Sequence, residues 1–207
     1  NDETQTGILD DEKYRRLLLD SGSMVIKIYK RSMIIDHELW YPEHMQYEDN
    51  CMSPLWLLYC THFERVPEPL YYYYQHAAST VHTVSMNGCR DRMKAMELFR
   101  KEMVKRGFSE RFYPEMEFRF TELYFITTLF SCMQGKMKGK YRFVGELKTG
   151  MLKAFPDFME NTYYQKKMGP EEKKLISLLL KSQALFFIYY YSLNGYRKWR
   201  RRLKEKV

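Results

Sequence analysis

The stretch Tyr47-Glu48-Asp49-Asn50 opens the part of the sequence that decides the fold, because an apolar run extends from it to Phe63. The run contains Ser53 and Pro54, residue types that suit the first turn of a helix. We therefore predict a helix over residues 50–63 with the acidic pair at its amino end.

A second marker, Pro69-Leu70-Tyr71-Tyr72-Tyr73, lies downstream of this helix. Aromatic residues favour strands, and we expect residues 65–75 to be extended. Proline has no N–H to donate to a ladder, so Pro67 and Pro69 restrict this segment to an edge strand or to two short pieces.

The amino-terminal part predicts short elements of both kinds. Residues 24–29 alternate weakly and are partly β-branched, which favours a strand. In chain order we expect a helix over 9–19 capped by Asp10 or Asp11, a strand over 24–29, a helical turn over 32–39 and a loop over 40–46.

Beyond Ser85 the pattern becomes helical. Met93, Met96, Phe99 and Met103 recur with a helical period. We expect helices over 89–105, 118–133, 145–154 and from Gly169 to about Tyr191, with a basic loop over 135–140. The predicted fold class is α+β and mainly helical, divided into residues 1–86 with a few short strands and a helical C-terminal region over residues 87–207.

Composition narrows the functional classes. The chain has 207 residues, of which 45% are hydrophobic and 29% charged, which permits a packed core and argues against a multi-span membrane protein. The formal net charge of +8 admits nucleic acid, an anionic membrane surface or a phosphorylated ligand as partner. Nucleic acid is not expected, because no motif for binding it accompanies the charge.

The four cysteines form no zinc-binding pattern. Cys51, Cys60, Cys89 and Cys132 include no Cys-x-x-Cys pair, and no metal site is predicted from them. So few cysteines in a chain of this length indicate reduced thiols and a cytoplasmic setting. No signal peptide or membrane-spanning run is evident in the sequence, so the expected location is the cytoplasm or the inner face of the membrane.

Glu48 and Asp49 are the residues for which a chemical role can be argued. Neighbouring positions on a helix diverge by about 100°, so one carboxylate can face a cleft while the other caps the helix. A carboxylate at such a place can accept a proton from a bound hydroxyl. An acidic helix cap is the more ordinary interpretation of the same residues.

Four short motifs occur in an order that resembles the carboxyl-side part of bacterial family 2 glycosyltransferases with the GT-A fold. They are Lys27-Ile28-Tyr29-Lys30-Arg31, then Tyr47-Glu48-Asp49-Asn50, then Pro69-Leu70-Tyr71-Tyr72-Tyr73, and then Ser79-Thr80. The resemblance covers roughly residues 11–84. It implies the acceptor-side half of a GT-A domain, followed by a variable helical tail.

The resemblance implies specific roles. Asp49 would be the general base that deprotonates the acceptor hydroxyl, with Glu48 supporting the acceptor or the fold. Tyr47, Tyr73 and Ser79 would contact substrate. The complete enzyme would move a sugar from a nucleotide-sugar donor, held with Mg²⁺ or Mn²⁺, to a saccharide or lipid-linked acceptor. Inversion of configuration and a place in cell-surface polysaccharide synthesis are further expectations.

The chain departs from the family pattern in three places. Val25-Ile26 stands where Trp-Asn is common, and Tyr74-Gln75-His76 stands where an arginine often follows the aromatic strand. His76, or alternatively His82, would then meet phosphate or metal, although a solvated loop histidine is the commoner case. The Asp-x-Asp metal motif of the nucleotide-binding half is absent. We therefore expect the chain alone to be inactive, with no bound metal.

The carboxyl-terminal tail is both aromatic and basic. The predicted helix is broken at Asn194-Gly195, and a cluster of seven cations follows it: Arg197, Lys198, Arg200, Arg201, Arg202, Lys204 and Lys206. Aromatic residues beside cations are typical of a peripheral membrane segment, and a solvated terminus explains them equally well. The alternative function is a non-catalytic helical interaction module whose basic tail binds an acidic partner or a membrane surface.

Overall fold

The structure is a computed structural model that describes residues 3–74 and 84–204. Its fold class is mainly helical with a small two-stranded sheet, which agrees with the predicted class at that level. The first part contains short elements: η1 (Glu3–Gln5), β1 (Gly7–Ile8), α1 (Asp11–Leu19), η2 (Met24–Ile26), α2 (Arg31–Asp36), α3 (Glu48–Leu58) and β2 (His62–Phe63).

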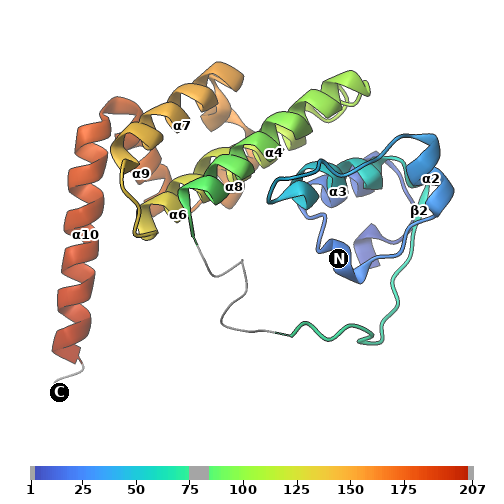
Figure 1. Cartoon of the computed structure of the whole chain (residues 1–207), viewed down its shortest axis with the longest axis horizontal. Coiled ribbons are helices and arrows are strands. Elements are labelled where there is room, and N and C mark those ends of the chain that lie inside the picture. Colours follow the sequence, from blue (N-terminus) through green and yellow to red (C-terminus); the bar gives the residue numbers. More distant parts are fainter. Residues whose placement is uncertain (1–2, 75–83, 205–207) are drawn as a thin grey trace.

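The second part is a succession of helices (Figure 1). They are α4 (Met86–Lys105), α5 (Tyr113–Phe120), the π-helix η4 (Thr121–Thr127), α6 (Thr128–Gln134), α7 (Lys140–Ala154), η5 (Phe158–Glu160), α8 (Thr162–Lys167), α9 (Pro170–Lys181) and α10 (Gln183–Lys204). Helix α5, η4 and α6 follow one another without a break, so the helix predicted over 118–133 lies within a longer helical run.

The predicted cap of the first helix is confirmed. Asp10 is the N-cap of α1, and its side chain accepts a hydrogen bond from the backbone N–H of Lys13 at 2.9 Å. At the other face of α1, the Tyr14 hydroxyl donates to the carbonyl of Cys60 at 2.7 Å. This bond ties α1 to the end of α3.

Both predicted strands are wrong for the described residues. Residues 24–26 form a single 3₁₀ turn closed by the N–H of Lys27 and the carbonyl of Met24, and no strand forms between residues 64 and 74. Side chains that favour strands are insufficient without a neighbouring strand to pair with. Val25 and Ile26 are both exposed, and Pro67 and Pro69 remove two donors from the second segment.

The sheet forms at residues where no strand was predicted. Gly7 pairs with Phe63 and Ile8 with His62 in an antiparallel pair. The helix predicted over 50–63 therefore ends early, at Leu58, and the chain turns back so that the N–H of Leu9 donates to the carbonyl of Thr61 at 3.0 Å. The turn brings the amino-terminal segment alongside the end of α3.

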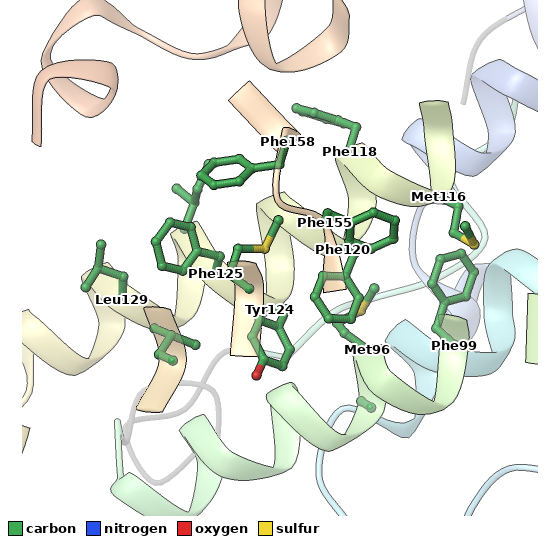
Figure 2. Close-up of a cluster of buried hydrophobic side chains, with 14 of the residues drawn as sticks. Met96, Phe99, Met116, Phe118, Phe120, Tyr124, Phe125, Leu129, Phe155 and Phe158 are labelled. Atoms are coloured by element: carbon green, nitrogen blue, oxygen red, sulfur yellow. The ribbon is translucent and has the colours of Figure 1, made fainter. Parts of the chain in front are cut away.

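One hydrophobic core joins the two predicted regions. Leu18, Cys51 and Leu55 belong to the same buried cluster as Phe99 and Phe120. Figure 2 shows aromatic and methionine side chains from α4, α5 and η4 packed together, with the rings of Phe120 and Tyr124 stacked at 4.4 Å. The hydrophobic packing is continuous across residue 86, and the division into two regions there stays a prediction.

The last helix differs from the prediction in both its start and its end. The break falls at Ser182, whose extended backbone separates α9 from α10, and α10 then runs through Asn194 and Gly195 to Lys204. Ser182 starts the new helix, since its carbonyl and its hydroxyl accept hydrogen bonds from the N–H groups of Phe186 and Leu185. A glycine inside a helix costs only about 1 kcal/mol, which the rest of α10 tolerates.

Candidate functional site

The candidate site lies at the amino end of α3, where the acidic pair occupies the first turn. Tyr47 precedes the helix in the left-handed region, with φ of 65°. Glu48 is half-buried and Asp49 is exposed, whereas every residue from Cys51 to Leu58 is buried. The helix is thus fixed in the core while its first turn presents one carboxylate to solvent.

The predicted acidic cap is wrong, because the N-cap of α3 is Tyr47, which makes no side-chain capping bond, and Asp49 lies inside the first turn. Its Oδ1 accepts a hydrogen bond from the N–H of Asn50 at 2.8 Å, and the same N–H donates to the carbonyl of Tyr47 at 3.1 Å. Among the described residues, no group donates a hydrogen bond to Oδ2 of Asp49. One oxygen therefore holds the carboxylate in place while the other faces solvent.

Tyr47 fixes the start of α3 against α4 and α6. The guanidinium of Arg92, a buried residue of α4, lies over the Tyr47 ring at 4.3 Å from its centroid. Arg92 also donates to the hydroxyl of Ser131 at 3.3 Å. The Tyr47 ring is thus engaged in a cation–π contact, which desolvation of the arginine strengthens. In this structure its contacts hold the fold, and its predicted role in substrate contact stays a prediction.

A second buried arginine lies beneath the turn. Arg119 of α5 donates to the carbonyl of Leu18 at 3.2 Å, to the hydroxyl of Ser21 at 3.3 Å and to the carbonyl of Asn50 at 3.5 Å. One side chain thereby joins α1, the loop after it and the first turn of α3. Arg119 is 6% exposed, and no carboxylate of the described residues lies within ion-pair distance of it.

The electrostatics of the site centre on Arg119. Burial lowers the pKa of the Arg119 guanidinium to about 10, and the nearby carboxylates of Glu122, Asp49 and Asp20 oppose this effect. The guanidinium stays charged at neutral pH, because its pKa remains well above 7. The Asp49 carboxylate therefore lies in the field of a fixed positive charge.

Two further residues belong to this environment. Burial raises the pKa of Glu122, a carboxyl group on the first turn of η4, while the charge of Arg119 opposes the rise. Burial also raises the pKa of the Tyr41 phenol, to which the charges of Asp49 and Glu48 contribute. Tyr41 thus places a phenol near the acidic pair, and Glu122 places a carboxyl group near Arg119.

Sequence reasoning missed Arg119, Glu122 and Tyr41. A signal existed for Arg119, because it interrupts the run Phe118-Arg119-Phe120 of a helix expected to be buried. Charged side chains are almost never fully buried without partners, so a cation in such a helix indicates a polar contact across the core. Nothing in the sequence indicates which carbonyls it meets.

The remaining predicted site residues do not join this group in the described structure. Tyr73 is exposed and lies on the irregular segment between residues 64 and 74, which Figure 1 shows looping away from the helices. His76, Ser79 and the alternative His82 lie outside the described residues. Of the predicted site residues that the structure describes, Tyr47, Glu48 and Asp49 lie together and Tyr73 lies apart from them.

The described residues contain neither a cluster of metal ligands nor a membrane-spanning helix. No three or more His, Cys, Asp or Glu side chains in the described ranges are grouped so that they could hold a metal ion. In the same ranges, no helix has both the length and the hydropathy needed to cross a membrane.

Comparisons of the chain with protein-family models, with curated proteins and with solved structures gave no match.

Proposed function

We propose that this chain is the acceptor-side half of an inverting family 2-like glycosyltransferase, with Asp49 as the general base. One observation carries the proposal: Asp49 is an exposed carboxylate on the first turn of a helix whose residues from Cys51 to Leu58 are all buried. A catalytic group needs a rigid support and access to its substrate, and this position provides both.

In the proposed reaction, Oδ2 of Asp49 accepts the proton of an acceptor hydroxyl. The hydroxyl oxygen forms a bond to the anomeric carbon of the donor sugar, and the bond from that carbon to the nucleoside diphosphate breaks. The hydrogen bond that the N–H of Asn50 donates to Oδ1 orients the carboxylate. Glu48, half-buried beside it, supports the first turn.

The donor and its metal belong to the other half of the proposed enzyme. The chain contains no Asp-x-Asp motif, and the described residues include no group fit to hold a metal ion. A Mg²⁺ or Mn²⁺ ion bound by the donor half would stabilise the leaving diphosphate. The proposed donor is a nucleotide sugar, and the acceptor is a saccharide or a lipid-linked saccharide.

The decisive test is sugar transfer in a polypeptide that carries this chain together with a donor-binding half. Asp49→Asn keeps the size and the local hydrogen bond of the side chain but removes the base, so we expect the rate to fall by about 10² to 10⁴. Asp36→Asn, at an exposed aspartate at the end of α2, is the matched control and should leave the rate unchanged. Equal rates for wild type and Asp49→Asn would overturn the proposal.

A second test uses the chain alone. We expect no heat of binding when it is titrated with uridine or guanosine diphosphate sugars in the presence of Mn²⁺. Micromolar binding would show that the chain has its own donor site and would contradict the assignment to the acceptor side. The alternative, a non-catalytic interaction module, gains support if Asp49→Asn leaves the rate of sugar transfer unchanged with every donor-binding half that is tested.

A further inference from the structure

Helix α10 exposes apolar side chains in a regular pattern. Leu185, Ile188, Tyr196, Trp199 and Leu203 are all large, apolar and exposed. Their carboxyl-terminal members lie on the half of the helix that extends beyond the other helices, at the left edge of Figure 1. Residues 195–203 are exposed without exception, so no described part of the chain covers this half.

These side chains fall on one narrow face. Successive helical residues are about 100° apart, so Leu185, Ile188, Ser192, Tyr196, Trp199 and Leu203 lie within an arc of about 80°. We call these six residues the uncharged stripe. Arg200 and Arg202 flank it, each about 40° beyond one edge of the arc. No charged residue of α10 up to Leu203 falls inside the arc.

The opposite face of α10 is occupied by the body of the protein. Phe186 and Tyr190 are buried there, and Arg197 forms an ion pair with Glu171 of α9 at 2.5 Å. The uncharged stripe therefore has no part in holding α10 to the rest of the fold. It is a separate face that the observed packing leaves free.

Further positive charge lies on the Arg202 side of the stripe. An open cavity of about 810 Å³ lies between α10 and the loop that joins α6 to α7, and its lining includes Lys136, Lys138, Lys140 and Lys198. No carboxylate lines this cavity, whereas two tyrosines and two methionines do. The surface beside the stripe is therefore cationic.

We propose that the uncharged stripe docks on an anionic lipid surface, with α10 lying along the plane of the interface. A helix with one apolar face, flanking arginines, and Trp and Tyr at the boundary matches the requirements of an interfacial helix. The flanking cations and the lysine-lined cavity are complementary to phosphate headgroups of acidic lipids. This inference is independent of the proposed transferase function.

The principal test is co-sedimentation of the full chain with vesicles of phosphatidylcholine alone or mixed with phosphatidylglycerol. We expect binding to the anionic vesicles only, weakening as salt is added. Arg200→Gln with Arg202→Gln should weaken it by about fivefold for each cation lost, roughly 30-fold together. Arg100→Gln with Lys101→Gln, an equal charge change at exposed residues of α4, is the control and should have little effect.

The apolar part of the contact is tested by a matched pair of tryptophans. Trp199 and Trp40 are 58% and 60% exposed, and only Trp199 lies on the stripe. Trp199→Ser should weaken binding to anionic vesicles by at least about tenfold, and Trp40→Ser should not. In the Trp40→Phe variant, tryptophan emission should shift to shorter wavelength when vesicles are added, and in Trp199→Phe this shift should be lost.

Each of the following outcomes would overturn the proposal. The first is that wild type fails to sediment with anionic vesicles. The second is that Trp199→Ser binds as well as wild type, or that the α4 control pair weakens binding as much as the α10 pair. The third is that wild type and Trp199→Ser bind soluble polyglutamate equally and neither binds vesicles, which would identify an acidic protein as the occupant.

Discussion

Helices α5 and α10 break the usual distribution of residues in opposite directions. Helix α5 buries Glu115, Glu117 and Arg119 inside the body, whereas α10 exposes Trp199 and Leu203 at its free end. Each buried charge has polar partners: Arg15 and the Tyr163 hydroxyl contact Glu115, and the Asn161 amide donates to Glu117 at 2.8 Å. The exposed apolar residues at the free end of α10, in contrast, are not covered by other described parts of the chain.

The comparison separates residues that hold the fold from residues free for another task. A buried charge that meets several backbone and side-chain groups fixes the relative position of the elements it joins. An exposed apolar stripe contributes little to stability, because folding does not remove it from water. We therefore expect substitutions in α5 to change stability and substitutions on the stripe to change binding.

The largest expected effect on stability is that of Arg119→Ala. The substitution leaves the carbonyls of Leu18 and Asn50 without this donor and opens a cavity between α1, α3 and α5. We expect the free energy of unfolding to fall by about 3 kcal/mol, measured by urea denaturation. Arg200→Ala on α10 is the control and should stay within about 0.5 kcal/mol of wild type. A similar small change for Arg119→Ala would contradict the cross-linking role.

A pair of glycines gives the next effect. The position that a Cβ of residue 150 would occupy is taken by the hydroxyl oxygen of Tyr124, whereas no atom lies within 4 Å of a Cβ at Gly195. Gly150→Ala should lower the free energy of unfolding by about 1–2 kcal/mol through overpacking. Gly195→Ala should be neutral or raise it by up to about 1 kcal/mol, because alanine favours a helix.

Removal of the hydroxyl provides an internal check on this pair. In a Tyr124→Phe background most of the cost of Gly150→Ala should disappear, as measured by a double-mutant cycle in urea. Additive effects of the two substitutions would show that the predicted clash does not occur. The effect of Gly150→Ala on stability would then have a cause other than contact with the Tyr124 hydroxyl.

The smallest effect is a loss of stability at high pH. Burial raises the pKa of the Tyr124 phenol to about 12, with a further contribution from the charge of Glu97. The folded state therefore favours the neutral phenol, and this contribution is fully present below pH 10 and is lost as the pH rises from about 10 to 12. Tyr124→Phe should make the loss shallower by no more than about 1 kcal/mol near pH 11. Identical pH profiles of unfolding would contradict this.

The sequence predicted the parts of the fold that depend on local signals. The Asp10 cap, the helix α4 and the start of α9 at Pro170 were all predictable, because capping residues and helical periods act over a few positions. The short sheet was not, since β1 and β2 pair across more than fifty residues and carry no strand pattern. Ser182 is a residue type that often begins a helix, so the break before α10 was open to prediction there. The prediction placed the break at Asn194-Gly195 instead, because glycine is the stronger signal for the end of a helix.

The candidate site was also predictable only in part, because some of its contacts join residues that are far apart in the sequence. The sequence predicted Glu48 and Asp49 at the amino end of a helix that would begin at residue 50, and the structure begins that helix two residues earlier, at Glu48. The contacts of Arg119 and Arg92 could not be predicted, because they join residues far apart in the chain through backbone carbonyls and ring faces. Tyr73 was expected to contact substrate because of the resemblance to the glycosyltransferase family, and the strand predicted around it does not form in residues 64–74.

The single-residue junction at Ser182 has a consequence for orientation. If α10 were joined to the other helices by a long flexible linker, those helices could rotate freely relative to a surface that α10 binds. Helix α10 is instead joined to α9 through one residue and is fixed along its side by Phe186, Tyr190 and the Arg197–Glu171 ion pair. A surface bound by α10 would therefore have a fixed orientation relative to the rest of the protein. The distance from that surface to the first turn of α3 would also be fixed.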